Sequence, residues 1–122
     1  IIIRNTLSYP AGLGIRVSDN RISGVVSGRA LDFYRCEKLV VSGNEISQSS
    51  GGSSVVRLDL SGPTSVSGNI ISWSGASPPS FSIEFGSPQI SNSSVVTGNI
   101  SSGVPGGNSI ATAVVAANNV VI

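Results

Sequence analysis

Several residue types on which enzyme chemistry commonly depends are scarce or missing in this chain. Histidine and methionine are absent, and the 122 residues include one cysteine and one tryptophan. Without histidine, neither a Ser-His-Asp triad nor a Cys-His pair can form. Cys36 has no second cysteine to join, which excludes an internal disulfide and a multi-cysteine metal site, so we interpret it as a small buried hydrophobe. We therefore predict no metal site and no cofactor.

Charge is also scarce. Charged residues make up 11% of the chain, and 7 basic and 6 acidic side chains leave a net charge of +1. We predict no binding of nucleic acid, which requires a dense cationic surface. No apolar run reaches the about 18 residues of a membrane span, so no membrane insertion is predicted. All charged residues except Glu84 lie at or before Asp59. A second half so poor in charge indicates burial against another subunit or another part of the molecule, although a short serine-rich β surface also stays soluble alone.

Small and β-branched residues are abundant. The chain has 25 serines and 15 glycines, and its hydrophobic fraction of 39% is rich in Val and Ile. That fraction is too high for a disordered segment, while Gly, Ser, Asn and β-branched residues disfavour helix in every window. We predict an all-β protein in which residues 1–122 form a single domain. Because Met is absent and both ends read as strand, we expect a fragment of a longer protein.

A six-residue pattern, apolar-x-x-Asn-x-apolar, recurs along the whole chain. The instances are residues 2–7, 17–22, 41–46, 66–71 and 115–120, with a sixth at 96–101 that ends in Ser101. The anchoring asparagines lie 15 to 30 residues apart with a mean of about 23, and self-similarity at such a period indicates a solenoid. At roughly 3.3 Å per residue, such a coil can close a three-sided cross-section and stack in parallel on the next. We predict about five to six coils.

Each repeat is expected to place its asparagine at a corner between two strands. Gly often precedes the Asn, and both residues accept a positive φ at low cost. Corners stacked about 4.8 Å apart would let the side-chain amides hydrogen-bond along the stack as an Asn ladder. The alternative is a series of hairpin turns, but these favour Asn-Gly over the Gly-Asn order found here. The expected corners lie near Asn5, Asn20, Asn44, Asn69, Asn99 and Asn118, and the last five form the expected ladder.

The motif Val-Ser-Gly-Asn-x-Ile, repeated at coil spacing in a chain rich in Ser and Gly, resembles the right-handed parallel β-helix proteins. This group includes pectate-lyase-like enzymes and bacteriophage tailspikes, and the resemblance covers essentially all 122 residues. In its low charge and its lack of calcium-ligand clusters, the chain is more similar to the distal part of a tailspike than to a pectate lyase. The resemblance implies a homotrimer that binds, and often cleaves, the polysaccharide coat of a bacterium, and that is located outside the cell on the virion tail.

If this chain cleaves polysaccharide, its acidic residues are the candidates. Three expected strands each carry an acid between apolar residues, an alternation that places the acid on the outer face. Glycoside hydrolysis needs two carboxyl groups about 5 to 9.5 Å apart, and equivalent positions in stacked coils meet that spacing. The catalytic candidates are Asp32, Asp59 and Glu84, which we expect at equivalent strand positions. The alternative is that these acids only keep the surface soluble.

For carbohydrate binding, Trp73 is the first candidate. It lies beside a loop of Gly, Ser and Pro, where an exposed ring would offer a flat apolar face to a sugar. The alternative is that the ring packs this loop onto the solenoid wall. Tyr34 is a weaker candidate of the same kind, and Arg57, near the acids, completes the predicted carbohydrate-binding set.

Three functions remain open at this stage. The first is a tailspike segment that gives structural support and binds capsule or lipopolysaccharide, with any cleavage site elsewhere in a larger depolymerase. The second is a polysaccharide hydrolase or lyase whose site lies within this chain. The third is the non-catalytic stalk of a bacterial adhesin or autotransporter at the cell surface.

Overall fold

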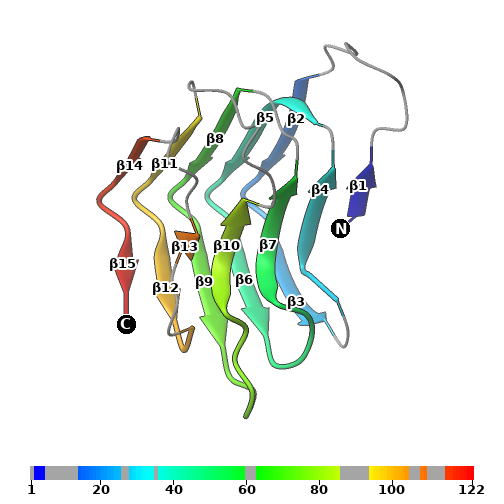
Figure 1. Ribbon diagram of the computed structural model, residues 1–122, viewed down its shortest axis with the longest axis vertical. Coiled ribbons are helices and arrows are strands. Elements are labelled where there is room, and N and C mark those ends of the chain that lie inside the picture. Colours follow the sequence, from blue (N-terminus) through cyan, green and yellow to red (C-terminus); the bar gives the residue numbers. More distant parts are fainter. Residues whose placement is uncertain are drawn as a thin grey trace.

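The computed structural model describes residues 2–4, 14–25, 28–34, 36–59, 63–85, 94–104, 108–109 and 115–122. Within these ranges all regular structure is β, in strands β1 to β15 (Figure 1). Consecutive strands belong to three sheets in turn, so each strand pairs with the strand three places later in the chain. All of these pairings are parallel, which means that the polypeptide winds as a coil with each turn laid on the previous one.

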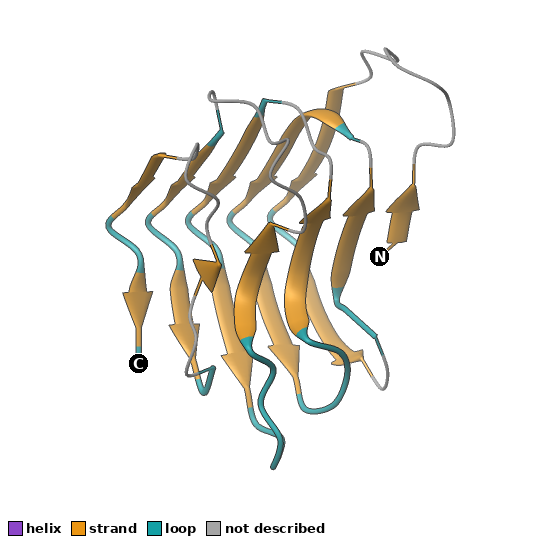
Figure 2. Cartoon of the chain, viewed as in Figure 1, coloured by secondary structure: helices purple, strands orange, loops and turns teal. Residues whose placement is uncertain are grey.

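Each sheet takes one strand from every turn of the coil, and Figure 2 shows the strands of each sheet as a row of neighbouring arrows. Sheet A contains β1 (Ile2–Arg4), β4 (Leu31–Tyr34), β7 (Ser54–Asp59), β10 (Phe81–Phe85) and β13 (Asn108–Ser109). Sheet B contains β2 (Gly14–Ser18), β5 (Glu37–Ser42), β8 (Thr64–Ser67), β11 (Val95–Thr97) and β14 (Val115–Ala117). Sheet C contains β3 (Arg21–Val25), β6 (Glu45–Gln48), β9 (Ile70–Trp73), β12 (Ile100–Ser102) and β15 (Val120–Val121).

This topology confirms the predicted all-β parallel β-helix. It has about four to five coils, fewer than the predicted five to six. The corner predicted near Asn5 lies outside the described residues.

The inside of the coil is filled by aliphatic and aromatic side chains that stack in register from turn to turn. In a strand, alternate residues face opposite sides, so one set of positions supplies the core and the other the surface. Burying each Val, Leu, Ile or Phe contributes about 1.5 to 3 kcal/mol relative to exposure. The buried columns are Leu31, Val56 and Ile83 in sheet A; Val41, Val66 and Val96 in sheet B; and Ile46 and Ile71 in sheet C.

Ser101 interrupts the apolar column of sheet C, at the position where the sequence repeat is degenerate. It pairs with Ile71 in register and is 1% exposed. Its hydroxyl hydrogen-bonds that of Ser82, also buried, at 2.8 Å. A polar group inside the coil is tolerated here because it has a partner, since burying an unpaired hydroxyl costs about 1 to 3 kcal/mol.

A column of asparagine side chains runs along the corner between sheets B and C. Each Nδ2 donates to the Oδ1 of the next coil, at 3.0 Å from Asn20 to Asn44, 2.9 Å from Asn44 to Asn69, 2.8 Å from Asn69 to Asn99 and 2.9 Å from Asn99 to Asn119. Backbone groups supply the remaining hydrogen bonds of these side-chain amides. For example, Asn69 Nδ2 also donates to the Val41 carbonyl, and its Oδ1 also accepts from the Asn44 backbone N–H. Asn44, Asn69 and Asn99 are at most 1% exposed, and the hydrogen-bonding capacity of these amides is filled.

The last rung of this ladder is Asn119, so the prediction of Asn118 is wrong by one residue. Thr97 pairs with Ala117, which makes Asn119 the equivalent of Asn99 and Asn118 the equivalent of Gly98. Gly98 has a φ of 64° and Asn118 one of 55°, the left-handed region. Asn is one of the few residues other than Gly that accept this region. Two adjacent asparagines therefore have different roles, and their order cannot be read from the six-residue pattern alone.

The ladder generates a prediction for a near-isosteric substitution. In Asn69→Asp the two N–H donors toward Asn99 and Val41 are replaced by an oxygen that meets two acceptor oxygens inside the protein. We expect the free energy of unfolding to fall by at least about 2 kcal/mol, because buried polar groups lose their partners. Because the buried carboxyl is protonated more readily when folded, the deficit should shrink as the pH falls. Chemical denaturation at neutral and acidic pH measures both effects.

Asn118→Asp is the matched control for this substitution. Asp19, the residue before Asn20, already occupies the equivalent corner position four coils earlier, with a φ of 57°. The control should therefore stay within about 0.5 kcal/mol of the original chain. Equal losses for the two variants would contradict the ladder as the stabilising element.

Candidate functional site

The outer face of sheet A carries an alternating row of opposite charges. Strand β4 has Leu31 and Phe33 buried and Asp32 and Tyr34 half-buried, so Asp32 and Tyr34 face outward. Arg57 on β7 pairs with Asp32 on one side and with Glu84 on β10 on the other. Both Arg57 and Glu84 are half-buried. The fold thus gathers four of the residues selected from the sequence on one face.

Asp59 does not lie in this row. It pairs with Tyr34, two residues further along β7 than Arg57, so the expected stack of three equivalent acids is wrong. The error comes from counting the acid between apolar neighbours in each strand, because the β7 residue that pairs with Asp32 and with Glu84 is Arg57 and not the acid. An arginine rather than an acid separates Asp32 from Glu84, and the side chain of Asp59 lies outside the described residues.

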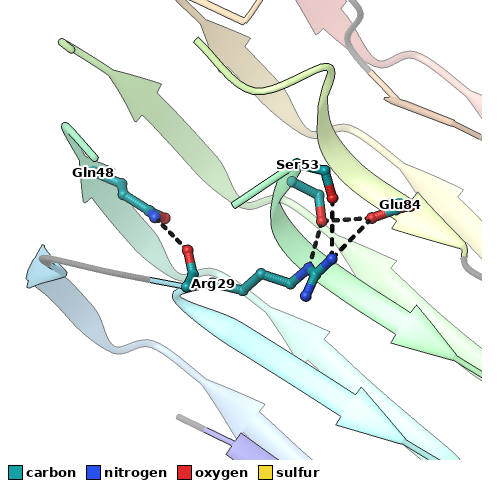
Figure 3. Close-up of polar contacts among 6 residues, drawn as sticks. Arg29, Gln48, Ser53 and Glu84 are labelled. Carbon is teal, nitrogen blue, oxygen red and sulfur yellow. Dashed lines mark hydrogen bonds and ion pairs between the residues drawn. The ribbon is translucent and has the colours of Figure 1, made fainter. Parts of the chain in front are cut away.

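Arg29 links three successive coils beside this row (Figure 3). Its Nε donates to Ser54 Oγ at 2.9 Å, and its Nη2 donates to Ser53 Oγ at 3.0 Å. Ser54 in turn donates to Glu84 Oε2 at 2.7 Å, and Arg29 Nη2 lies 3.7 Å from the same oxygen. The side chains of Arg29 and Glu84 are 19% and 22% exposed. Charge-assisted bonds to a buried hydroxyl hold both charged groups in fixed positions while leaving part of each open to solvent.

The sequence motifs did not identify Ser53 and Ser54 as members of this site. Serine is common everywhere in the chain, so composition gives no signal for them. The usable signal is spacing, since Arg29 and Ser54 are 25 residues apart, one coil, and lie at or just before the start of the equivalent strands β4 and β7. Residues that precede stacked strands become neighbours once the register is known.

Trp73 lies away from this face, in sheet C. It is 8% exposed and pairs in register with the buried Gln48. Its indole N–H donates to the Gly75 carbonyl at 3.0 Å, within the connection between β9 and β10 that projects at the bottom of Figure 2. The ring therefore packs beneath its own loop, and the proposal that it offers a flat exposed face to a sugar is wrong.

Cys36 is buried and unsuited to nucleophilic chemistry. Burial raises the pKa of its thiol above the usual value, and the thiol donates a hydrogen bond to the Tyr34 carbonyl at 3.5 Å. The thiolate, which is the reactive form, is therefore disfavoured at neutral pH. Among the residues that the structure describes, no three His, Cys, Asp or Glu side chains are grouped closely enough to hold a metal ion.

Comparisons with known proteins add no relative. No protein-family model, no curated protein and no solved structure matches this chain. In the described part of the chain, no helix has the length and apolar character needed to cross a membrane.

The placement of Trp73 can be tested directly, because it is the single tryptophan in the chain. We expect blue-shifted fluorescence emission and weak quenching by acrylamide, since the indole is packed inside the protein. Addition of polysaccharide should change neither property. A red-shifted emission that acrylamide quenches readily would show that the indole is exposed. If polysaccharide also reduced that quenching, Trp73 would belong to the binding site.

Proposed function

We propose that this chain is a segment of a bacteriophage tailspike that provides structural support and binds bacterial surface polysaccharide, either capsule or lipopolysaccharide. The binding surface is the outer face of sheet A, formed by Asp32, Tyr34, Arg57 and Glu84 with Arg29 at its edge. In this proposal the protein acts outside the cell, on the virion tail, as a homotrimer.

The observation that carries the proposal is the in-register row Asp32, Arg57 and Glu84. Carboxylates accept and guanidinium groups donate hydrogen bonds, which are the two kinds of partner that sugar hydroxyls require. Tyr34 lies next to Asp32's position on the same face and adds a half-buried ring. Because these groups stand on strands and Glu84 is held by Ser54 and Arg29, little side-chain freedom is lost on binding.

The same row favours binding over cleavage. A glycosidase needs its two carboxyl groups about 5 to 9.5 Å apart with the scissile bond between them. Asp32 and Glu84 are two strand spacings apart, roughly 10 Å along the coil axis, and Arg57 stands at the level between them. One oxygen of Glu84 is already bonded to Ser54. We place any depolymerase activity of the whole spike outside this pair of acids.

An adhesin or autotransporter stalk on the bacterial cell surface is the second candidate. It is favoured by the continuous Asn ladder, which stabilises a rigid rod and requires no ligand. Polysaccharide binding by sheet A separates the two candidates.

Binding is tested with a panel of capsular polysaccharides and lipopolysaccharides from different bacteria. We expect Arg57→Met to weaken binding to the recognised polysaccharide by at least about tenfold, because hydrogen bonds to a charged group are lost while the aliphatic stem remains. Arg21→Met is the control. It removes the same charge from sheet C, where Arg21 is 80% exposed and pairs with Glu45 at 3.5 Å. Isothermal titration calorimetry gives the affinities.

Two outcomes would contradict the proposal. If the original chain binds nothing in the panel, polysaccharide recognition by sheet A is wrong and the stalk is favoured. If the polysaccharide is bound and reducing sugar is released, and Glu84→Gln abolishes the release, the chain is an enzyme.

The oligomeric state is tested by sedimentation. Ile70, Ile100 and Val120 form an in-register apolar row on the outer face of sheet C and are 50%, 38% and 49% exposed. We place the subunit contact there, because apolar groups gain most from removal from water. The chain, of 12.3 kDa, should sediment as a trimer.

Ile100→Ser should shift the equilibrium toward monomer, whereas Val95→Ser, at a 37% exposed position on sheet B, should not. A monomer at all concentrations would contradict the homotrimer.

A further inference from the structure

The charges on the outer face of sheet A balance one another. Arg29 pairs with Glu84 at 3.7 Å, and Arg57 stands in register between Asp32 and Glu84. The described side chains of this face therefore supply two carboxylates, with one guanidinium group between them in the row and a second one at its edge. Of the other cations whose side chains the structure describes, Arg16 and Lys38 lie on sheet B and Arg21 lies on sheet C.

This balance decides what the surface can bind. An anionic sugar would have to compete with Glu84 for Arg29 and with the two flanking acids for Arg57, and it would be repelled by both carboxylates. A neutral sugar meets no such opposition. Its hydroxyls can accept from the guanidinium N–H groups and donate to the carboxylate oxygens without breaking the existing contacts.

We propose that the ligand of sheet A is an uncharged polysaccharide segment, recognised by hydrogen bonds and not by net electrostatic attraction. This inference rests on the proposed function and specifies its substrate class. The binding energy comes from fixed donors and acceptors, so it is nearly independent of ionic strength, unlike the binding of a charged polymer.

The test compares neutral and anionic bacterial polysaccharides at about 0.01 M and about 0.15 M salt, between which the Debye length falls from about 30 Å to about 8 Å. We expect the bound members of the panel to be neutral and their affinity to change by less than about twofold between the two salt concentrations. Binding confined to anionic polysaccharides, with a loss of about tenfold or more at the higher salt, would overturn the inference while leaving polysaccharide binding intact. Binding to no polysaccharide would overturn the proposed function and this inference together.

A pair of variants tests the balance itself. Glu84→Gln removes one negative charge from sheet A and leaves an amide that still accepts from Ser54. We expect this variant to bind neutral polysaccharide with an affinity at least about fivefold lower, because an acceptor with full charge is lost. We also expect it to bind anionic polysaccharide in a salt-sensitive way, since one guanidinium charge is no longer offset. Glu45→Gln makes the same change in net charge on sheet C, at a 50% exposed position. It should change neither the affinity for neutral polysaccharide nor the affinity for anionic polysaccharide. If both variants gain anionic binding equally, overall charge and not the sheet A row controls selectivity, and the inference is wrong. Thermal unfolding of both variants checks that each is folded.

Discussion

The stacked carboxamides at the corner between sheets B and C constrain every other part of the structure. An asparagine buried there is stable only if the coils above and below present their own asparagines at the same level, because each lost partner costs about 1 to 3 kcal/mol. A slip of one residue between two coils would break the column and also turn a strand's core residues to the surface. The residue before each asparagine must accept a left-handed backbone, which Gly43, Gly68 and Gly98 do freely. The ladder therefore fixes the register of sheets B and C where they meet, and the stacked core column of Leu31, Val56 and Ile83 continues the alignment in sheet A.

Register in turn creates the candidate site. Arg57 stands between Asp32 and Glu84 only because β4, β7 and β10 are held at one alignment. Consecutive rungs of the ladder are 24, 25, 30 and 20 residues apart, so the loops absorb the variation in length while the corner stays constant. The 30-residue coil includes the loop that covers Trp73. Length changes are tolerated there because closing a longer loop costs little extra free energy. A regular scaffold can thus carry a polar surface whose geometry does not depend on those loops.

The sequence predicts the architecture well because the six-residue repeat contains the residues that the backbone conformation of each corner requires. Gly-Asn between β-branched residues requires a left-handed corner followed by a strand, and that requirement is local enough to read from six residues. The site was harder to predict because it depends on register between strands that are a coil apart. Asp59 illustrates this difficulty: like Asp32 it lies between two apolar residues, yet it pairs with Tyr34 and not with Asp32. The misplacement of Asn118 has the same origin, since either of two adjacent asparagines fits the pattern until the pairing of Thr97 with Ala117 is known. Burial of Trp73 could not be foreseen because a loop of Gly, Ser and Pro can either expose a ring or fold over it.

Hydrogen exchange of the asparagine side-chain amides, followed by nitrogen-15 NMR, tests the central claim most directly. If the coils are pinned by a buried ladder, the Nδ2 protons of Asn44, Asn69 and Asn99 should exchange as slowly as the core backbone amides, while those of the exposed Asn118 exchange freely. Fast exchange at all four side chains would show that the column does not exist in solution. The shared register, the charged row on sheet A and the functions inferred from it would then lose their foundation.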